Sequence, residues 1–478
     1  MAELLRQIII WGGNVMETIK IAYLGGGSKQ WARVFMNDLA LNDDMTGEIG
    51  LYDIDTHAAK RNQKIGERIN NAPETVSRWK YTVYENLDEC LAGADFVVIS
   101  ILPGTFKEMK SDVHAPEKYG IYQSVGDTAG PGGVFRAMRT VPIYETFAKA
   151  IRKCCPNAWV INFTNPMSIC TKTLYDVFPE IKAFGCCHEV FHTQDFLCDV
   201  LKEETGISAK RNELYTEVSG INHFTWISSA KYKNFEIFDV LPDYIEKHFA
   251  EGHYEHGSAD QYKTDSFAYA NRVKMDLFKR YGCLGAAGDR HLAEFMNNSW
   301  YLKSKEQIDE WKFALTTVDF RIKQMNERIK ESEGLADGTI PVKVEKSDEE
   351  AVDLMRAILG LTTKVSNVNL PNEGQMPGLP IGAIVETNAV FSADSVRPVM
   401  AKPLPESVLS LVNRASSNVD TLYDGIKKRD FSIIFRSFVN QPLCSWLSLL
   451  EAQKLFAEMV NNTGAYLKEY FQFSLDKY

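Results

Sequence analysis

Hydrophobic and polar positions along the first half of the chain predict a strand, a tight turn and a helix in succession. Residues 19–24 are mostly apolar and partly β-branched, and this run ends abruptly in Gly25-Gly26-Gly27-Ser28. The residues that follow place apolar side chains at helical spacing. The pattern is typical of the first unit of an α/β fold with a parallel sheet.

Further blocks extend the same alternation. Residues 49–52, 94–101 and 158–163 have the continuous apolar character of strands buried on both faces. Residues 125–133 are rich in glycine and precede a predicted helix, so we expect a loop that forms one wall of an active site. Residues 331–347 are charged and predict a second loop.

The chain as a whole predicts two intimately packed parts. We expect a Rossmann-like doubly wound sheet in residues 19–215 and a mixed α+β, mainly helical domain in residues 216–478. Residues 1–18 have one short apolar patch, too short for the core of a signal peptide, and we expect a disordered or poorly docked leader.

Composition narrows the choice of partners. The chain has 478 residues, a net charge of -10 and 24% charged residues. A negative surface disfavours non-specific binding to nucleic acid or anionic lipid, and no apolar run is long enough to cross a membrane. The cysteine number, nine, is odd, and the sequence contains no Cys-x-x-Cys. We therefore expect a cytoplasmic protein that acts on a small molecule.

The glycine turn predicts a dinucleotide site. Gly25, Gly26, Gly27 and Ser28 would let the backbone approach a pyrophosphate at the start of a helix, although the third glycine of the usual pattern is absent. Asp53 ends the second predicted strand, where an acidic side chain can bind ribose hydroxyls and repel a 2′-phosphate. This favours NAD over NADP, and the alternative for Asp53 is a helix N-cap.

Two side chains further along are competent to bind a metal. Cys187 follows a predicted strand, and His223 lies in the separate segment of residues 220–224. Taken alone, a cysteine in such a place is more often an inert buried thiol, and a single histidine is more often structural.

Several motifs together resemble glycoside hydrolase family 4, the NAD- and divalent-metal-dependent glycosidases whose fold is similar to that of lactate and malate dehydrogenases. The resemblance covers almost the whole chain from about residue 19. The motifs that carry it are Gly25-Gly26-Gly27-Ser28, residues 125–133 with Arg136 and Arg139, residues 162–167, Cys187-His188-Glu189, and residues 220–224.

The resemblance implies a redox route to hydrolysis that differs from the usual pair of carboxylates. NAD oxidises the sugar at C3, a base removes the acidified C2 proton, the aglycone leaves, water adds, and the ketone is reduced again. By resemblance, Cys187 and His223 are the metal ligands. Thiolate ligation by itself would favour zinc, iron or cobalt, whereas the family implies Mn2+.

The resemblance also suggests roles for nearby residues. Asn165 matches the family asparagine that contacts the substrate. The family uses a Tyr or Asp as the C2 base, and Asp289 is the candidate here, with a surface ion pair to Arg290 as the alternative. His188 takes the place of the leaving-group acid, or binds a sugar hydroxyl.

Residues after the metal cysteine indicate the sugar. Cys187-His188-Glu189-Val190 is similar to the α-galacturonidases of the family, and Arg290 is a candidate partner for the carboxylate of a uronic-acid glycoside or oligosaccharide. We therefore predict hydrolysis of α-D-galacturonides.

Alternatives remain at this stage. Within the family they are an α-glucuronidase and an α-galactosidase. From other classes they are a 2-hydroxyacid dehydrogenase, which would share the fold, and a silent NAD-binding sensor. By analogy with the family we expect a homo-dimer or homo-tetramer.

Overall fold

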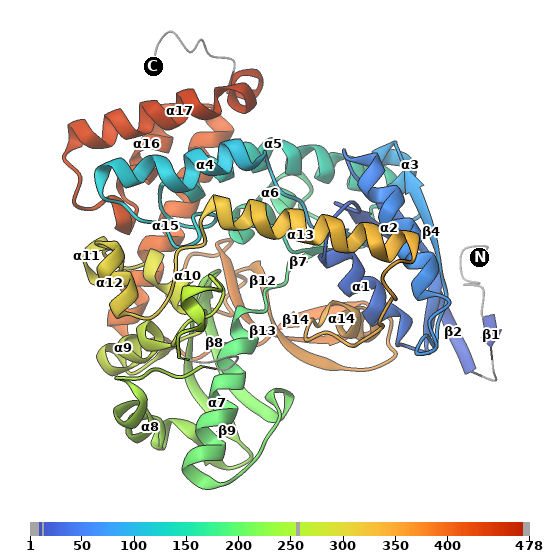
Figure 1. Ribbon diagram of the computed structural model, residues 1–478, viewed down its shortest axis with the longest axis horizontal. Helices are drawn as coiled ribbons and strands as arrows, with labels where there is room; N and C mark the ends of the chain where they lie inside the picture. Colours follow the sequence, from blue (N-terminus) through green and yellow to red (C-terminus); the bar gives the residue numbers. More distant parts are fainter. Residues whose placement is uncertain (1–8, 12–13, 255–258, 472–478) are drawn as a thin grey trace.

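One large mixed sheet runs through the molecule (Figure 1). The computed structural model of the protein describes residues 9–11, 14–254 and 259–471. The strands of the sheet fall into a parallel half and an antiparallel half, which meet at a single bridge between Gly185 and Asn369.

The parallel half has the strand order of a dinucleotide-binding fold. Its strands lie in the order β7-β6-β5-β2-β3-β4, so β2, the first of these parallel strands along the chain, is central and the order reverses beside it. The predicted Rossmann-like doubly wound sheet is thereby confirmed. These strands are β2 (Asn14–Leu24), β3 (Met45–Tyr52), β4 (Trp79–Tyr84), β5 (Phe96–Ile99), β6 (Trp159–Asn162) and β7 (Lys182–Gly185).

Residues of β2 show why this half is covered on both faces. Ile21 and Tyr23 belong to one buried apolar cluster, whereas Ala22 and Leu24 belong to another on the opposite face. Successive strand side chains point to opposite faces, so a strand that is apolar throughout needs helices on both sides.

The antiparallel half continues the sheet in the order β10-β9-β8-β13-β12. The β8–β9 hairpin carries residues 220–224 at its turn. The remaining strands are β8 (Leu214–Ile221), β9 (Phe224–Tyr232), β10 (Phe235–Glu236), β12 (Lys364–Pro371) and β13 (Ile384–Ser392), with β1 (Ile9–Trp11), β11 (Leu284–Gly285) and β14 (Ser395–Pro398) at the margins.

Helices cover the sheet and dominate the second part of the chain, as predicted. The helices that pack on the parallel half or follow its strands are α1 (Trp31–Ala40), α2 (Thr56–Ile69), α3 (Leu87–Leu91), α4 (Phe106–His114), α5 (Gly130–Cys154), α6 (Met167–Val177) and α7 (Glu189–Thr205). The later helices are α8 (Leu241–His248), α9 (Arg272–Tyr281), α10 (Asp289–Glu294), α11 (Asn298–Tyr301), α12 (Lys305–Glu310), α13 (Val318–Asp337), α14 (Ala351–Ile358), α15 (Glu406–Lys428), α16 (Phe431–Val439) and α17 (Leu449–Phe471). None of the helices in the described part of the chain has the length and apolar character needed to span a bilayer.

Two segments differ from their predicted structure. The leader is partly strand, because β1 pairs with the start of β2 and residues 14–18 belong to β2; residues 1–8 and 12–13 lie outside the described residues. The predicted loop at 331–347 begins as helix, since α13 continues to Asp337. Its charged residues are solvent-facing positions of a helix, a pattern that a charged loop shares.

Candidate active site

A cavity of about 550 Å³ lies at the carboxyl ends of the parallel strands. Ser100, Asn165 and Cys187 follow β5, β6 and β7 and all line it. In an open α/β sheet this edge, near the point where the strand order reverses, is where ligands bind. The second part of the chain supplies the facing wall, including His223 and His291.

The glycine turn forms the cofactor end of this edge. Gly25 has a φ of +98°, and a Cβ there would lie 1.9 Å from the carbonyl oxygen of Ser100, so no other residue fits without a shift of the backbone. The Asp53 carboxylate accepts a hydrogen bond from the backbone N–H of Gly27 at 2.8 Å. The N-cap of α2 is Asp55, so the N-cap alternative for Asp53 is wrong.

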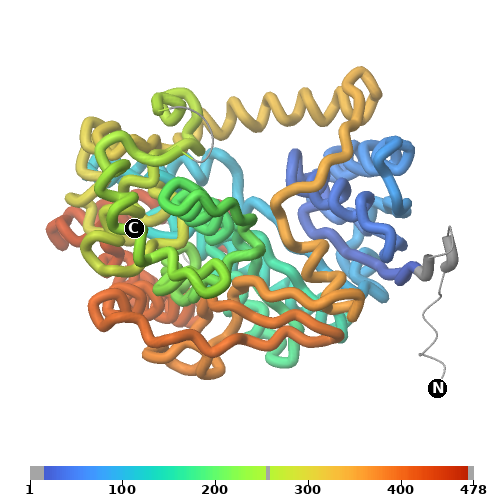
Figure 2. The backbone as a smooth tube through the Cα atoms, turned by 90° about the horizontal axis from the view of Figure 1, so that it is seen from below, coloured from blue at the N-terminus to red at the C-terminus, as the bar shows by residue number. Residues whose placement is uncertain are grey.

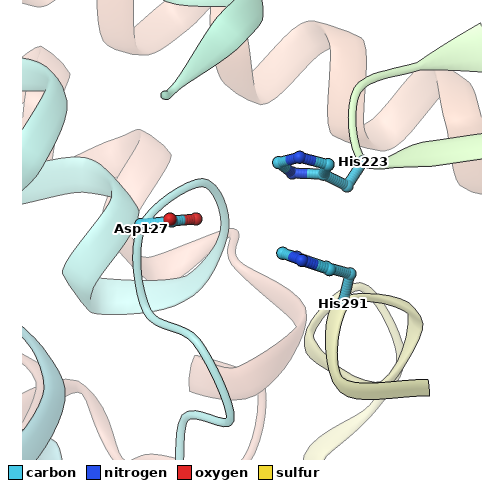
Figure 3. A group of neighbouring side chains, drawn as sticks. All are labelled: Asp127, His223 and His291. Carbon is cyan, nitrogen blue, oxygen red and sulfur yellow. The ribbon is translucent and has the colours of Figure 1, made fainter. Parts of the chain in front are cut away.

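Three side chains form a group that can hold a metal ion. Asp127 comes from the glycine-rich loop before α5, His223 from the β8–β9 turn and His291 from α10 (Figure 3). One potential ligand atom from each lies within 4.8 Å of the others. Imidazole nitrogens and a carboxylate oxygen suit manganese better than a thiolate does.

Neighbouring groups orient the two imidazole rings. Nδ1 of His223 lies 3.1 Å from Oγ1 of Thr128, and Nε2 of His291 lies 3.4 Å from Oε1 of Glu189. The rings stack with their centroids 4.2 Å apart. Each contact engages one ring nitrogen and leaves the other for a metal, which is how outer partners fix a ligand histidine.

Protonation in this group matches the needs of a metal site. Burial alone would raise the pKa of Asp127, but Arg136 and the two histidines lower it to about 2. Burial, together with His291, lowers the pKa of His223 to about 3. Near neutral pH, Asp127 is therefore ionised and His223 is neutral, as metal ligands must be.

Cys187 lines the same cavity but stands apart from this group. It is not among the three residues whose ligand atoms cluster within 4.8 Å. Burial, with Glu386 and Glu189 nearby, raises the pKa of its thiol well above the usual range. The structure thus brings His223 into a metal-competent group with Asp127 and His291, and leaves Cys187 as a neighbour of that group.

His188 lies on the cavity wall beside the cofactor end. Its ring packs against Trp31 with centroids 5.7 Å apart, and its Nδ1 lies 3.2 Å from Oε1 of Glu349. Burial would lower the pKa of His188, yet the contact with Glu349 raises it overall. A histidine with a raised pKa carries a proton that it can donate.

Asp289 is not placed where the sequence suggested. Its side chain is fully buried, does not line the cavity, and accepts a hydrogen bond from the backbone N–H of Lys274 at 3.0 Å. The carboxylate therefore faces the start of α9, where a negative charge is favourable. The alternative, a surface ion pair with Arg290, is also absent among the described residues, because Arg290 donates to Oγ1 of Thr316 at 2.6 Å instead.

Asn165 and Arg290 do line the cavity. Oδ1 of Asn165 is buried without a hydrogen-bond partner in the described part of the chain, while its backbone carbonyl accepts from Nε of Arg136 at 3.1 Å. The Arg290 guanidinium lies 4.9 Å from the Phe267 ring centroid, and its Nε has no partner among the described residues. Both residues thus line the cavity, and each has a buried polar atom without a partner among the described residues.

Sequence reasoning missed several residues of this wall. Asp127 lies in the glycine-rich segment 125–133, and His291 lies next to the candidate Arg290, but spacing along the chain could not show that their side chains meet. Tyr269, Arg321 and Arg328 also line the cavity, and they lie in segments without a motif.

Comparison with known proteins identifies the family. The profile of the family 4 glycosyl hydrolases matches residues 20–203, and that of the family 4 glycosyl hydrolase C-terminal domain matches residues 218–444. The chain belongs to glycosyl hydrolase family 4. The resemblance noted in the motifs is thereby confirmed.

Individual relatives cover almost the whole chain. An α-galacturonidase from Thermoanaerobacter italicus is 50% identical over 458 residues, which are 96% of this chain and 99% of the relative. The crystal structure of lplD from Bacillus subtilis is 44% identical, with a TM-score of 0.88, and covers 92% of this chain and 99% of that one. A 6-phospho-α-glucosidase from gut microorganisms, solved with NAD and Mn2+, shares the fold at 18% identity, with a TM-score of 0.74 and coverage of 94% and 99%.

Proposed function

We propose that this family 4 enzyme hydrolyses α-D-galacturonides with the help of NAD and a divalent metal. The observation that carries the proposal is the likeness, at 50% identity over nearly the full length of both chains, to an α-galacturonidase. The cavity supports it, because one space extends from Gln30 and Trp31, which follow the dinucleotide-type glycine turn, to a group of metal-competent side chains. When bound, NAD takes up and returns a hydride, and the metal polarises the sugar oxygens.

Asp127, His223 and His291 are the first candidates to hold the metal, with Mn2+ as the expected ion. The fit rests on their donor types and on the 4.8 Å spacing of their ligand atoms. Cys187 remains a candidate for a further ligand from the same wall. Asn165, with its unused buried Oδ1, is placed to bind a hydroxyl group of the sugar.

Tyr269 replaces Asp289 as our candidate for the group that removes the C2 proton. Tyr269 lines the cavity, and Asp289 does not. The Lys274 ammonium lies 5.9 Å from the centroid of the Tyr269 ring. His188 is the candidate for protonation of the leaving group, and Arg290 for binding the uronate carboxylate.

The decisive experiment measures the release of p-nitrophenol from p-nitrophenyl α-D-galacturonide under reducing conditions, with and without NAD and Mn2+. We expect release only when both are present, and loss of release in His291→Ala. Cleavage of an α-glucuronide or a neutral α-galactoside in place of the galacturonide would overturn the sugar assignment alone. Net NADH formation from a hydroxy acid without cleavage would overturn the glycosidase.

Location and assembly belong to the same proposal. All nine cysteines are free thiols, which supports a reducing cytoplasm. Trp446, Leu449 and Leu450 lie near the start of α17 with at least half of their surface exposed, which supports a homo-dimer or homo-tetramer through the C-terminal helices. Light scattering that shows a monomer at working concentration would contradict the oligomer.

A further inference from the structure

Helix α13 crosses the cavity and is fastened mainly at its ends. Val318, at one end, packs with Met109 and Val113, and Leu335, near the other, belongs to the core of the parallel half. No residue from 319 to 331 is buried. Figure 2 shows the helix, in yellow-orange, extending from the second part of the chain to the N-terminal part. Such a helix serves as a bridge and not as a core element.

The cavity side of this bridge carries two arginines. Arg321 and Arg328 both line the cavity. They lie two helical turns apart on one face, with about 10 Å of rise between them. Lys323 and Lys330 are exposed, so the helix has cations on its outer side that do not reach the cavity.

Neither arginine makes an ion pair with a residue that the structure describes, although Asp127 and Glu294 lie near Arg321 and Glu331 near Arg328. Arg321 donates only to the backbone carbonyls of Thr316 at 3.4 Å and Val125 at 3.3 Å, and within the described residues it makes no ion pair. Arg328 has neither a hydrogen bond nor an ion pair to any residue that the structure describes.

Neighbouring cations at the cofactor end, in contrast, have carboxylate partners. Arg33 pairs with Glu331 at 2.6 Å, and Lys29 lies 3.5 Å from Asp55. The guanidinium of Arg328 lines the cavity, and no described carboxylate pairs with it, so it remains available to an anion.

The positions of the two arginines indicate two different anions. Arg328 shares the cavity wall with Gln30 and Trp31 at the start of α1, where a dinucleotide pyrophosphate binds in this fold. Arg321 approaches the metal-competent group from the other side, since it donates to Val125, two residues before Asp127. In NAD a single ribose separates the pyrophosphate from the reacting nicotinamide, so one helix can reach both the cofactor and the sugar beside it.

We propose that α13 binds both ligands at once: Arg328 the pyrophosphate of NAD, and Arg321, beside Arg290 on the same cavity wall, the carboxylate of the uronic acid. The proposal rests on the proposed function, and it adds a cofactor-binding and a specificity-determining residue to it. Because both groups sit on one helix held at its ends, cofactor binding through Arg328 positions Arg321 for the substrate.

The cofactor contact is tested by ligand binding without turnover. Titration calorimetry would compare the wild-type enzyme with Arg328→Met, using NAD, ADP and adenosine, and with Lys330→Met as the matched control. We expect Kd for NAD and for ADP to rise about tenfold or more in Arg328→Met, with adenosine unaffected and Lys330→Met unchanged. An unchanged Kd for ADP would overturn the role of Arg328.

The substrate contact is tested by specificity. We expect Arg321→Met to lower kcat/KM for the p-nitrophenyl α-galacturonide about tenfold or more relative to the neutral α-galactoside, to leave Kd for NAD unchanged, and to be partly rescued in Arg321→Lys. Lys323→Met is the control. An equal loss on both substrates would overturn the carboxylate contact.

Different results would overturn the proposed function and the role of α13. If the wild-type enzyme binds no NAD, the proposed function falls together with this inference. If it binds NAD and cleaves galacturonides while Arg328→Met and Arg321→Met behave as wild type, only the role of α13 falls. Circular dichroism checks that each variant folds. If Arg328→Met does not fold, Arg328→Gln is used in its place.

Discussion

At the scale of single residues, the site depends on groups that come from distant parts of the chain. Asp127, His223 and His291 lie in a loop, a hairpin turn and a short helix, yet their ligand atoms come within 4.8 Å. Their outer partners are equally distant, since Glu189 bonds both His291 and the backbone N–H of Gly288. Each of the two histidines is therefore held by structure that does not belong to its own segment.

Loss of His291 should abolish tight metal binding. We expect His291→Ala to weaken Mn2+ affinity by more than the roughly 10- to 100-fold that loss of an outer partner costs. Equilibrium dialysis would measure it. His248→Ala is the control, because His248 pairs with Glu203 at 2.6 Å and does not line the cavity. If His291→Ala keeps its affinity for Mn2+ while Cys187→Ser loses it, the metal ligand is the predicted Cys187 and not His291.

Glu294 should make stability depend on pH. Its carboxylate accepts from the backbone N–H groups of Val125 and Gly126, and burial raises its pKa from 4.5 to about 7. A carboxyl whose pKa is raised in the folded state contributes stability that is complete below pH 4.5 and is lost as the pH rises through 7.

Glu294→Gln removes this loss. We compare the free energy of unfolding of the variant with that of the wild type at pH 4 and at pH 8. Between these pH values we expect the difference to shift in favour of the variant by on the order of 3 kcal/mol. Urea unfolding at both pH values measures this change. Parallel curves for the two proteins across the range would contradict it.

At the scale of elements, a buried ion pair fastens α4 to α5, and α5 begins at the glycine-rich loop. Arg139 of α5 donates to both carboxylate oxygens of Asp112 in α4, and both side chains are almost fully buried. Burial raises the pKa of Asp112, and Arg139 opposes that effect. The pair therefore helps to hold the loop that carries Asp127.

Removal of one partner should be more harmful than removal of both. We expect Arg139→Met to lower the free energy of unfolding by about 3–5 kcal/mol, because Asp112 would be left buried and unpaired. The double variant Arg139→Met/Asp112→Leu should recover a large part of that loss. Denaturant unfolding measures the free energy of unfolding of the wild type and both variants. A double variant that is less stable than Arg139→Met would contradict this expectation.

At the scale of the whole molecule, one continuous sheet joins two halves that share the cavity. Asn165 and Cys187 come from the parallel half, while His223 and Tyr269 come from the second part. Helix α13 adds a second connection, with contacts to α2 at one end and α4 at the other. A ligand in the cavity therefore contacts both halves.

NAD should stabilise the fold as a whole. At a concentration 100 times its Kd, we expect NAD to raise the free energy of unfolding by about 2.7 kcal/mol, because it binds only the folded state. NADP at the same concentration should stabilise less, since Asp53 at the end of β3 repels a 2′-phosphate. Equal stabilisation by both cofactors would remove the predicted role of Asp53.

Local sequence was sufficient for much of the architecture. The run at 19–24, the glycine turn and the apolar blocks near 49, 96 and 159 all became parallel strands or their turn. Such strands are buried on both faces, so their composition alone reveals them. Motifs spread along the chain were likewise sufficient for the family.

Local sequence could not decide which way a side chain points, or how far a helix extends between two parts of the protein. Asp289 had the right type and neighbourhood for a base, but the start of α9 takes its carboxylate. The sequence pattern of the charged end of α13 is that of a loop. A helix that bridges two parts of a protein has few packing partners, so its sequence lacks the apolar stripe of a core helix.

The sequence by itself thus determined the doubly wound fold, the family and the cofactor edge, since these depend on local hydrophobic pattern and short motifs. The tertiary structure alone decided the assembly of Asp127, His223 and His291, the exclusion of Asp289 from the cavity, and the placement of Arg321 and Arg328 over it. The physical reason is distance along the chain: these groups are brought together by packing between elements, and no local pattern encodes a contact between residues more than sixty positions apart.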